Sequence, residues 1–210
     1  IDFPPDRDKR AASLKEALER VGLADGMVVS THHHLRNGDA VGNLIFDAGA
    51  EIGAKDLMWF PSASFPVHAN QLRHLDNGVI HHIEGSMNGP LGAYCSAGKM
   101  RGLGVLRSHG GRWQAIQDGE VHIDVAVVAA PAADPFGNCN GLGGSAACGL
   151  LGFALADSIY AERVIVPQEQ AVAVPPEVET RDAAAVMLQG LTAHYLSSST
   201  YPLESGDSCL

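Results

Sequence analysis

Short apolar runs and helix-spaced apolar residues alternate along the first 160 residues of the chain. The runs that fit buried strands lie at 27–30, 57–60, 79–83 and 124–130. Between them, apolar residues recur every three or four positions, most clearly at Val41, Leu44, Ile45 and Ala48. Strands that alternate with helices at this spacing predict an α/β fold with a mainly parallel sheet and flanking helices.

Capping and turn residues mark where the predicted helices begin and end. Ser13 is expected to begin a helix that Gly22 stops, and Pro66 to begin another that ends at 77–78. Asp39 is a suitable N-cap for the helix containing Val41, because its carboxylate can accept hydrogen bonds from the free amides of the first turn.

A polar loop, residues 31–39, follows the first predicted strand and precedes a predicted helix. Open α/β sheets bind ligands in such loops, and the amides and dipole at a helix N-terminus favour an anion. Arg36 adds a planar guanidinium that suits a carboxylate or phosphate. We therefore predict catalytic roles here for His32, His33, His34 and Arg36. Asn37 and Gly38 are predicted to bind substrate.

The three consecutive histidines allow several roles. They could act as general acids or bases, donate hydrogen bonds to a carbonyl, or bind a metal. Neighbouring residues in an extended segment point to alternate faces, so His32, His33 and His34 cannot easily bind one ion. No cysteine or carboxylate at zinc-ligand spacing accompanies them, and no metal site is predicted. The alternative is that one or two are buried histidines of the core.

Two further loops carry candidate binding residues. The first follows a predicted strand at 104–107 and contains Ser108, His109, Gly110, Gly111 and Arg112. Its two glycines would let backbone amides approach a ligand, and its arginine could bind an anion; the alternative is an ordinary glycine turn.

The second of these loops, 131–145, is too long for a simple connection. It offers the uncharged amides of Asn138 and Asn140 to a polar ligand such as a pantetheine arm or a carboxylate. The glycines at 141, 143 and 144 do not match the dinucleotide-binding fingerprint, and no Ser-His-Asp order can be assigned.

The net charge and the cysteine content limit the classes of partner and the cellular compartment that we expect. The formal charge of -10 argues against nucleic acid or an anionic membrane surface, which require a basic footprint, but leaves an anionic small substrate open. The four cysteines form no CxxC pair, so we expect reduced thiols in a cytoplasmic protein. We find no signal peptide and no apolar run long enough to span a bilayer.

Several motifs, in this order, resemble the N-terminal part of the citrate lyase alpha subunit over residues 10–162. They are DGM at 25–27, HHHLRNGD at 32–39, RSHGGR at 107–112, HIDVA at 122–126, and DPFGN at 134–138 with SAACG at 145–149. The resemblance implies half of a coenzyme A transferase fold and the activity of a citrate CoA-transferase. Such an enzyme exchanges the acetyl group on an acyl carrier subunit for citrate.

The same resemblance implies the partners. They are citrate, the beta subunit that cleaves the citryl thioester, and the acyl carrier gamma subunit with its phosphoribosyl-dephospho-CoA type prosthetic group. No cofactor bound covalently to this chain is expected, and an oligomer is possible. The loop 31–39 takes the place of a glycine-rich loop that helps to bind the thioester oxygen in related transferases. The family subunit also has a second, similar half that completes the active site.

The last fifty residues resemble a different family. YAERVIVP at 160–167, AAVMLQGLTAHYL at 184–196 and GD at 206–207 are similar to the middle of zeta-crystallin-like quinone oxidoreductases. In those enzymes an NADPH-binding glycine motif would follow. We therefore expect a transferase half at 1–162 and a quinone-oxidoreductase-like appendage at 163–210. We expect the chain as a whole to be an enzyme fragment without activity of its own. The alternatives are a quinone oxidoreductase fragment, an inactive binding module or a chimera of two protein fragments.

Overall fold

The structure is a computed structural model, and it describes residues 8–32 and 36–141. The chain divides into two units, Ile1–Arg163 and Val164–Leu210, and every described residue belongs to the first. The motif SAACG at 145–149 and the predicted appendage at 163–210 lie outside the described residues. Within the described part, no helix is both long and apolar enough to cross a membrane.

A four-stranded parallel sheet forms the centre of the fold. Its strands are β1 (Val28–His32), β2 (Leu57–Pro61), β3 (Ile80–Ile83) and β4 (Val125–Val128), arranged in the order β3-β2-β1-β4. Every neighbouring pair runs parallel. The α/β prediction with a mainly parallel sheet is confirmed.

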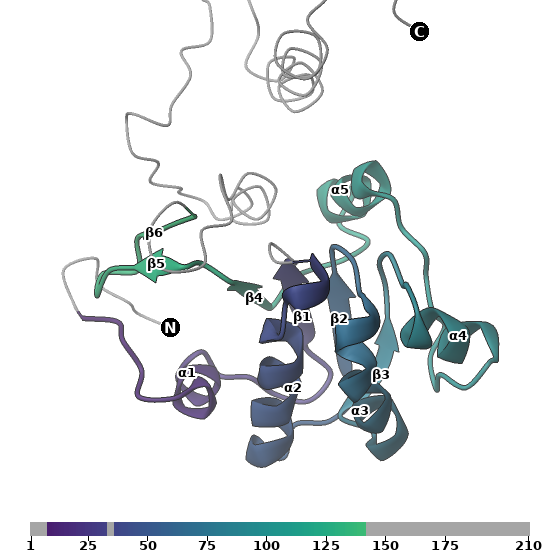
Figure 1. The fold of residues 1–210 in the computed structure, drawn as a ribbon, viewed down its shortest axis with the longest axis horizontal. Coiled ribbons are helices and arrows are strands. Elements are labelled where there is room, and N and C mark those ends of the chain that lie inside the picture. Colours follow the sequence, from purple (N-terminus) through teal and green to yellow (C-terminus); the bar gives the residue numbers. More distant parts are fainter. Residues whose placement is uncertain (1–7, 33–35, 142–210) are drawn as a thin grey trace, which may run out of the picture. The chain divides into compact units, whose positions relative to one another are not determined.

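Four helices contribute to the core on one face of the sheet, and Figure 1 shows α2 and α3 running along the strands. They are α1 (Leu14–Arg20), α2 (Val41–Ile52), α3 (Gln71–Asn77) and α4 (Pro90–Ser96). A short 3-10 helix, η2 (Pro66–Asn70), precedes α3. Trp59 of β2 is fully buried in this core, in edge-to-face contact with Phe46 of α2 at 5.6 Å between ring centroids. Burial of such apolar side chains is the main force that holds helices to a sheet.

The opposite face of the sheet carries the helix α5 (His109–Gln117). Met58 and Phe60 of β2 point to this side and pack with Ala115 of α5 and with Val121. Successive residues of a strand face opposite sides, so β2 is buried on both faces. This explains why the run at 57–60 is continuously apolar.

Several strands and helices differ from the prediction in where they end or in which residues they bury. The strand β1 extends through His32, two residues beyond its predicted end. In α2, Leu44 is 51% exposed while Phe46 is buried, because α2 packs with Ile45 and Phe46 inward. The predicted strand at 124–130 is shorter, and β4 forms one end of the described sheet with Ala126 exposed.

The prediction of a long loop at 131–145 is wrong for the first part of this segment. Residues 132–140 form a hairpin of two short antiparallel strands, β5 (Ala132–Ala133) and β6 (Cys139–Asn140). Asp134 stabilises the turn, because its Oδ1 accepts the amides of Phe136 at 2.8 Å and Asn138 at 2.9 Å. Aspartate side chains commonly organise turns in this way. The remainder of the loop, from residue 142, lies outside the described residues.

Candidate functional site

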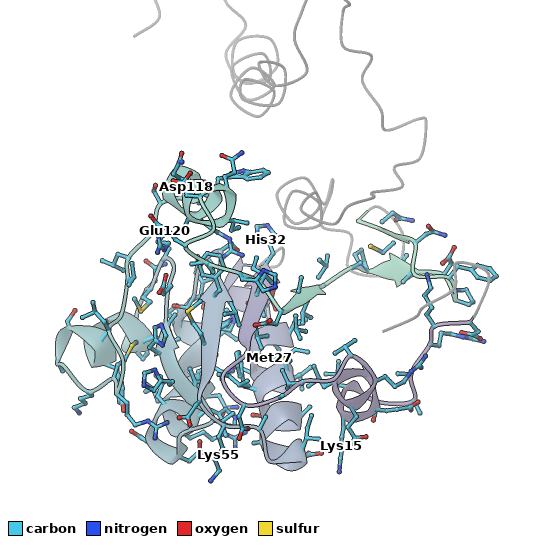
Figure 2. All side chains as sticks on the ribbon, turned by 180° about the vertical axis from the view of Figure 1, so that it is seen from behind. Lys15, Met27, His32, Lys55, Asp118 and Glu120 are labelled. Atoms are coloured by element: carbon cyan, nitrogen blue, oxygen red, sulfur yellow. The ribbon has the colours of Figure 1, made fainter. Side chains whose placement is uncertain are left out.

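The order in which strands are added to the sheet reverses between β1 and β4, and this switch point marks the position of the candidate site. The chain builds β1, β2 and β3 outward on one side, then returns to add β4 on the other side of β1. Ligands of open α/β sheets bind outside the carboxyl ends of the strands at such a switch point. The paired residues at this position are His32 and Val128. Figure 2 shows His32 at the end of β1 opposite Met27 and Lys55.

The segment after β1 belongs partly to the described structure. His33, His34 and Leu35 lie outside it, as does the side chain of Arg36. The short 3-10 helix η1 (Arg36–Gly38) follows. Asn37, which we predicted to bind substrate, uses its Oδ1 to accept the amide of Val67 at 3.0 Å. Gly38 is open around its Cα, with no atom within 4 Å of the position of an added Cβ.

Asp39 connects this segment to the next helix. Its side chain is buried, and its Oδ1 accepts the amide of Val41 at 2.8 Å. The prediction that Asp39 is the N-cap of α2 is wrong by one residue, because Ala40 occupies that position. The carboxylate nevertheless satisfies an amide of the first turn, as the prediction required. The negative charge of Asp39 also lies at the favourable end of the α2 dipole.

Buried polar side chains lie behind this edge, and several were not predicted. They include Ser30, Thr31, Ser62, Ser64 and His68, each at most 7% exposed. Thr31 accepts the indole N–H of Trp59 at 2.9 Å, and Ser64 accepts the amide of Asn88 at 3.2 Å. The signal that could have found Ser62 and Ser64 is the SAS sequence at 62–64, directly after an apolar run that ends at the same edge.

His68 is a histidine of this site that sequence reasoning missed. Its ring is 2% exposed, and its Nδ1 accepts the amide of Phe65 at 2.9 Å. Burial lowers the pKa of His68 below the ordinary value of 6.5, and the carboxylate and backbone of Asp39 partly oppose this shift. Trp59 contacts the ring edge-to-face at 5.5 Å. We therefore assign His68 a neutral ring at pH 7.

The second predicted binding loop is a helix. Residues 109–112 form the first turn of α5, and Ser108 is its N-cap, with its Oγ accepting the amide of Gly111 at 3.0 Å. A glycine pair suggested a loop, but the cap and the apolar contact of Ala115 stabilise a helix from His109 onward. Ser108, His109, Gly110 and Gly111 therefore lie at a helix N-terminus.

Arg112 is buried beneath the edge of the sheet. Its guanidinium donates to the carbonyl of Phe60 at 2.8 Å and to Oγ of Ser30 at 2.7 Å, and it lies 3.9 Å above the ring of Phe60. Only 2% of the residue is exposed. Arg112 therefore lies in the first turn of α5 and not in the predicted binding loop, and its positive charge is buried. Its predicted contact with substrate stays a prediction.

The two predicted asparagines of the third loop lie in the hairpin. Asn138 donates through Nδ2 to Oδ2 of Asp134 at 2.7 Å, and this bond is the largest cause of the lowered pKa of Asp134. Asn140 is in β6. Figure 1 shows the hairpin and α5 on opposite sides of β1. The structure thus places Arg112 against β1 and β2 through its bonds to Ser30 and Phe60, whereas Asn138 serves the turn of its own hairpin.

Comparison with known proteins identifies the family. A family model described as the alpha subunit of citrate lyase matches residues 7–187. The chain belongs to the citrate lyase alpha subunit family. The citrate lyase alpha chain of Escherichia coli is 40% identical over 171 residues, and that of Klebsiella pneumoniae 43% identical over 164 residues. These alignments cover 80% and 78% of this chain but 34% and 32% of the relatives, so the chain spans about a third of their length.

A solved structure of the same family has the same fold. It is the crystal structure of a putative alpha subunit of citrate lyase from Streptococcus mutans in complex with citrate. The two chains superpose with a TM-score of 0.73 at 34% identity, over 97% of this chain and 46% of that one. The resemblance of the sequence to this family is confirmed.

A shorter similarity points to a second family. A quinone oxidoreductase of Pseudomonas aeruginosa is 41% identical over 51 residues, which are 24% of this chain and 16% of that enzyme. This agrees with a partial resemblance to quinone oxidoreductases. The citrate lyase family match extends to residue 187, beyond the boundary near 162 that the sequence suggested. The division at that boundary stays a prediction.

The described residues contain no cluster suited to a metal ion, and one of their two cysteines is a poor nucleophile. Within 8–32 and 36–141, no three histidine, cysteine, aspartate or glutamate side chains are placed to hold a metal ion. Cys95 and Cys139 are free thiols, and burial raises the pKa of Cys139. A raised thiol pKa disfavours the reactive thiolate, so Cys139 is a poor candidate for a nucleophile.

Proposed function

We propose that the chain supplies the citrate-binding half-site of a citrate CoA-transferase, the alpha subunit activity of citrate lyase. The observation that carries this proposal is the shared fold with the Streptococcus mutans subunit, whose structure contains citrate. Supporting it, the sheet of this chain has its switch point at His32, where predicted anion-binding residues follow β1.

In the proposed reaction, citrate replaces the acetyl group of a thioester. A carboxylate of citrate attacks the acetyl carbonyl of the thioester on the prosthetic group of the acyl carrier gamma subunit and displaces the thiolate, which gives a mixed anhydride of citrate and acetate. The thiolate then attacks the citryl carbonyl of this anhydride, so that the citryl thioester forms and acetate leaves. The beta subunit then cleaves the citryl thioester. This chain would bind and orient citrate through Arg36, Asn37, Gly38 and the histidines, with amides at the N-termini of η1 and α5 favouring the anion.

Citrate binding is the first test of this proposal. Citrate should raise the melting temperature of the chain, because a ligand that binds the folded state stabilises it, and Arg36→Ala should remove the shift. The measurement is a thermal melt with and without citrate.

Lys55→Ala is the matched control for charge. Lys55 lies at the opposite end of the sheet from His32 (Figure 2), so its removal should leave the citrate shift unchanged. An absent shift in the parent chain, or an equal loss in both variants, would count against a citrate site at the end of β1.

The similarity to quinone oxidoreductase supports a second, weaker candidate. It covers 16% of that enzyme, too little for the fold of a complete oxidoreductase. We expect no NADPH-dependent quinone reduction by the purified chain, and measurable turnover would favour this function over the transferase.

A further inference from the structure

The chain between α4 and α5 covers the outer edge of the sheet at β3 (Figure 1). We call residues 101–107 of this part the edge segment. Its Val105 donates the amide to the carbonyl of Ile83 at 3.2 Å, and the carbonyl of Val105 accepts the amide of Gly85 at 2.8 Å. These bonds form an isolated parallel bridge instead of the strand predicted at 104–107. The edge segment thus satisfies backbone groups that an open sheet edge would expose.

Few apolar contacts hold the edge segment in place. No residue of the edge segment is buried, and Leu103 and Leu106 are 82% and 74% exposed. Elements with few buried contacts open locally at a lower free energy than the core. The attachment of the edge segment therefore depends on its hydrogen bonds and polar contacts with β3.

Two neighbouring histidines of β3, His81 and His82, lie directly against the edge segment. Their Nδ1 atoms are 3.0 Å apart, and their rings are nearly perpendicular. Gly102 donates its amide to the carbonyl of His81 at 3.3 Å. A Cβ on Gly102 would lie 2.5 Å from Cε1 of His81 and 2.9 Å from Cβ of His82. The edge segment therefore contacts the histidine pair through a glycine, and any movement of the rings acts on it.

The contact between the two rings allows one extra proton but not two. A hydrogen bond between two ring nitrogens needs an N–H on one and a lone pair on the other. With one extra proton, the ring that stays neutral can take the tautomer that leaves its Nδ1 as the acceptor. With both rings protonated, two N–H groups and two positive charges face each other at 3.0 Å. The rings of His81 and His82 must then separate, because like charges repel.

Glu84 connects the histidine pair to the other end of the edge segment. Its Oε1 lies 3.5 Å from Nε2 of His82, and its Oε2 accepts Nε of Arg107 at 2.9 Å. The side chains of Glu84 and Arg107 are only 14% and 17% exposed. Arg107 also donates to Glu120 at 3.3 Å. The edge segment is thus linked to the pair at Gly102 by packing and at Arg107 through a carboxylate.

We propose that His81 and His82 form a pH sensor that releases the edge segment from β3 when both rings are protonated. Separation of the rings displaces Gly102, and the bonds of Val105 to the β3 backbone are lost with it. The proton comes from solvent, and only hydrogen bonds break. This role goes beyond the proposed citrate site and does not depend on it.

The direction of the pH dependence follows from the surroundings of His82. Burial lowers the pKa of His82 below the ordinary value of 6.5, the Glu84 carboxylate opposes this shift, and His81 adds to it. The residue paired with His82 on β2 is the uncharged Met58. Because the folded-state pKa lies below 6.5, the contribution of the neutral ring is complete above that pH. It is lost as the pH falls through the folded-state pKa, so the edge segment is closed at neutral pH and opens in acid.

Amide hydrogen exchange of the full chain, followed by NMR, tests the release. The protection factors of Val105 and Gly85 should fall by at least about tenfold between about pH 7.5 and about pH 5.0, on either side of the ordinary histidine pKa. The amide of Ser62, bonded to Thr31 between β1 and β2, reports global unfolding and should keep its protection. Unchanged protection at Val105 and Gly85, or an equal loss at Ser62, would overturn the proposal.

His82→Asn removes the second proton but keeps the contact. Asparagine does not titrate, and its Oδ1 takes the position of Nδ1 and accepts the N–H of His81. The protection of Val105 should therefore be the same at both pH values in this variant. His122→Asn is the matched control, because His122 also lies near a carboxylate, Asp124 at 3.9 Å, but its side chain is 88% exposed. It should show the fall seen in the parent chain; an equal fall in His82→Asn would contradict the sensor.

Two further measurements do not depend on the folding of His82→Asn. Gly102→Ala places a Cβ against the His81 ring, so the protection of Val105 should be low at both pH values, whereas Gly110→Ala, with open space around its Cβ, should behave as the parent chain. In the parent chain, NMR titration of the two imidazoles should show the second protonation step at the pH where the protection of Val105 falls. Two clearly different midpoints, or full protection in Gly102→Ala, would reject the proposal.

Discussion

Arg112 shows how a single side chain can be misplaced by local sequence. Two glycines and a histidine precede it, a pattern that suggested an anion-binding loop. Its actual acceptors are a carbonyl 52 residues away and a hydroxyl 82 residues away in the chain. The guanidinium can be buried because these oxygens and the face of Phe60 replace water around it. No pattern of neighbouring residues could have predicted these partners.

Removing this guanidinium should destabilise the protein strongly. Arg112→Met takes away the buried donor that serves the hydroxyl of Ser30 and the carbonyl of Phe60, so we expect a loss of about 2–4 kcal/mol in the free energy of unfolding. Urea denaturation measures it. As the control, Arg101→Met removes a half-exposed pair with Asp56 and should cost at most about 1 kcal/mol. Similar small losses in both variants would show that Arg112 is not a structural residue.

At the level of elements, the helices and strands were largely predictable, but their ends were not. The existence of β1, β2, β3 and α2 follows from apolar periodicity, which is a property of adjacent residues. The start of α5 at His109 depends on Ser108 acting as its cap and on the packing of Ala115 against β2. Glycines at 110 and 111 favour a loop locally, and the cap and packing override that preference.

A substitution at Gly110 tests whether residues 109–112 form the first turn of α5 or a glycine loop. An added Cβ at Gly110 would meet no atom within 4 Å, so Gly110→Ala should stabilise α5 by about 0.5–1 kcal/mol. Chemical denaturation gives the value. Gly85→Ala is the contrast, since φ there is +151° and the Cβ would lie 2.3 Å from the carbonyl oxygen of Pro61; it should cost more than about 2 kcal/mol. A destabilised Gly110→Ala would indicate a backbone conformation that alanine cannot adopt.

At the scale of the whole molecule, the chain corresponds to about a third of its citrate lyase relatives. The family resemblance implies a second α/β half that completes the transferase site. If the groups at the end of β1 bind citrate as we propose, transfer still requires the thioester to be held against the citrate at the same time. We therefore expect this chain to bind citrate without catalysing the transfer.

An exchange assay tests that separation. The purified chain, given acetylated acyl carrier subunit and labelled citrate, should form no citryl thioester above the background of the uncatalysed reaction. The intact alpha subunit of a relative is the positive control. Robust turnover by the chain alone would contradict the expectation of inactivity, and it would show that residues 1–210 contain a complete transferase site.

Local sequence was sufficient for the fold class, the family and the order of the four parallel strands and of helices α1, α2 and α3 along the chain. Each of these depends on periodicity, caps or motifs that neighbouring residues carry together. Strand order, the switch point at His32 and the burial of Arg112 and His68 required the tertiary structure. They depend on pairing and hydrogen bonds between residues far apart in sequence, and only the folded chain brings those residues together.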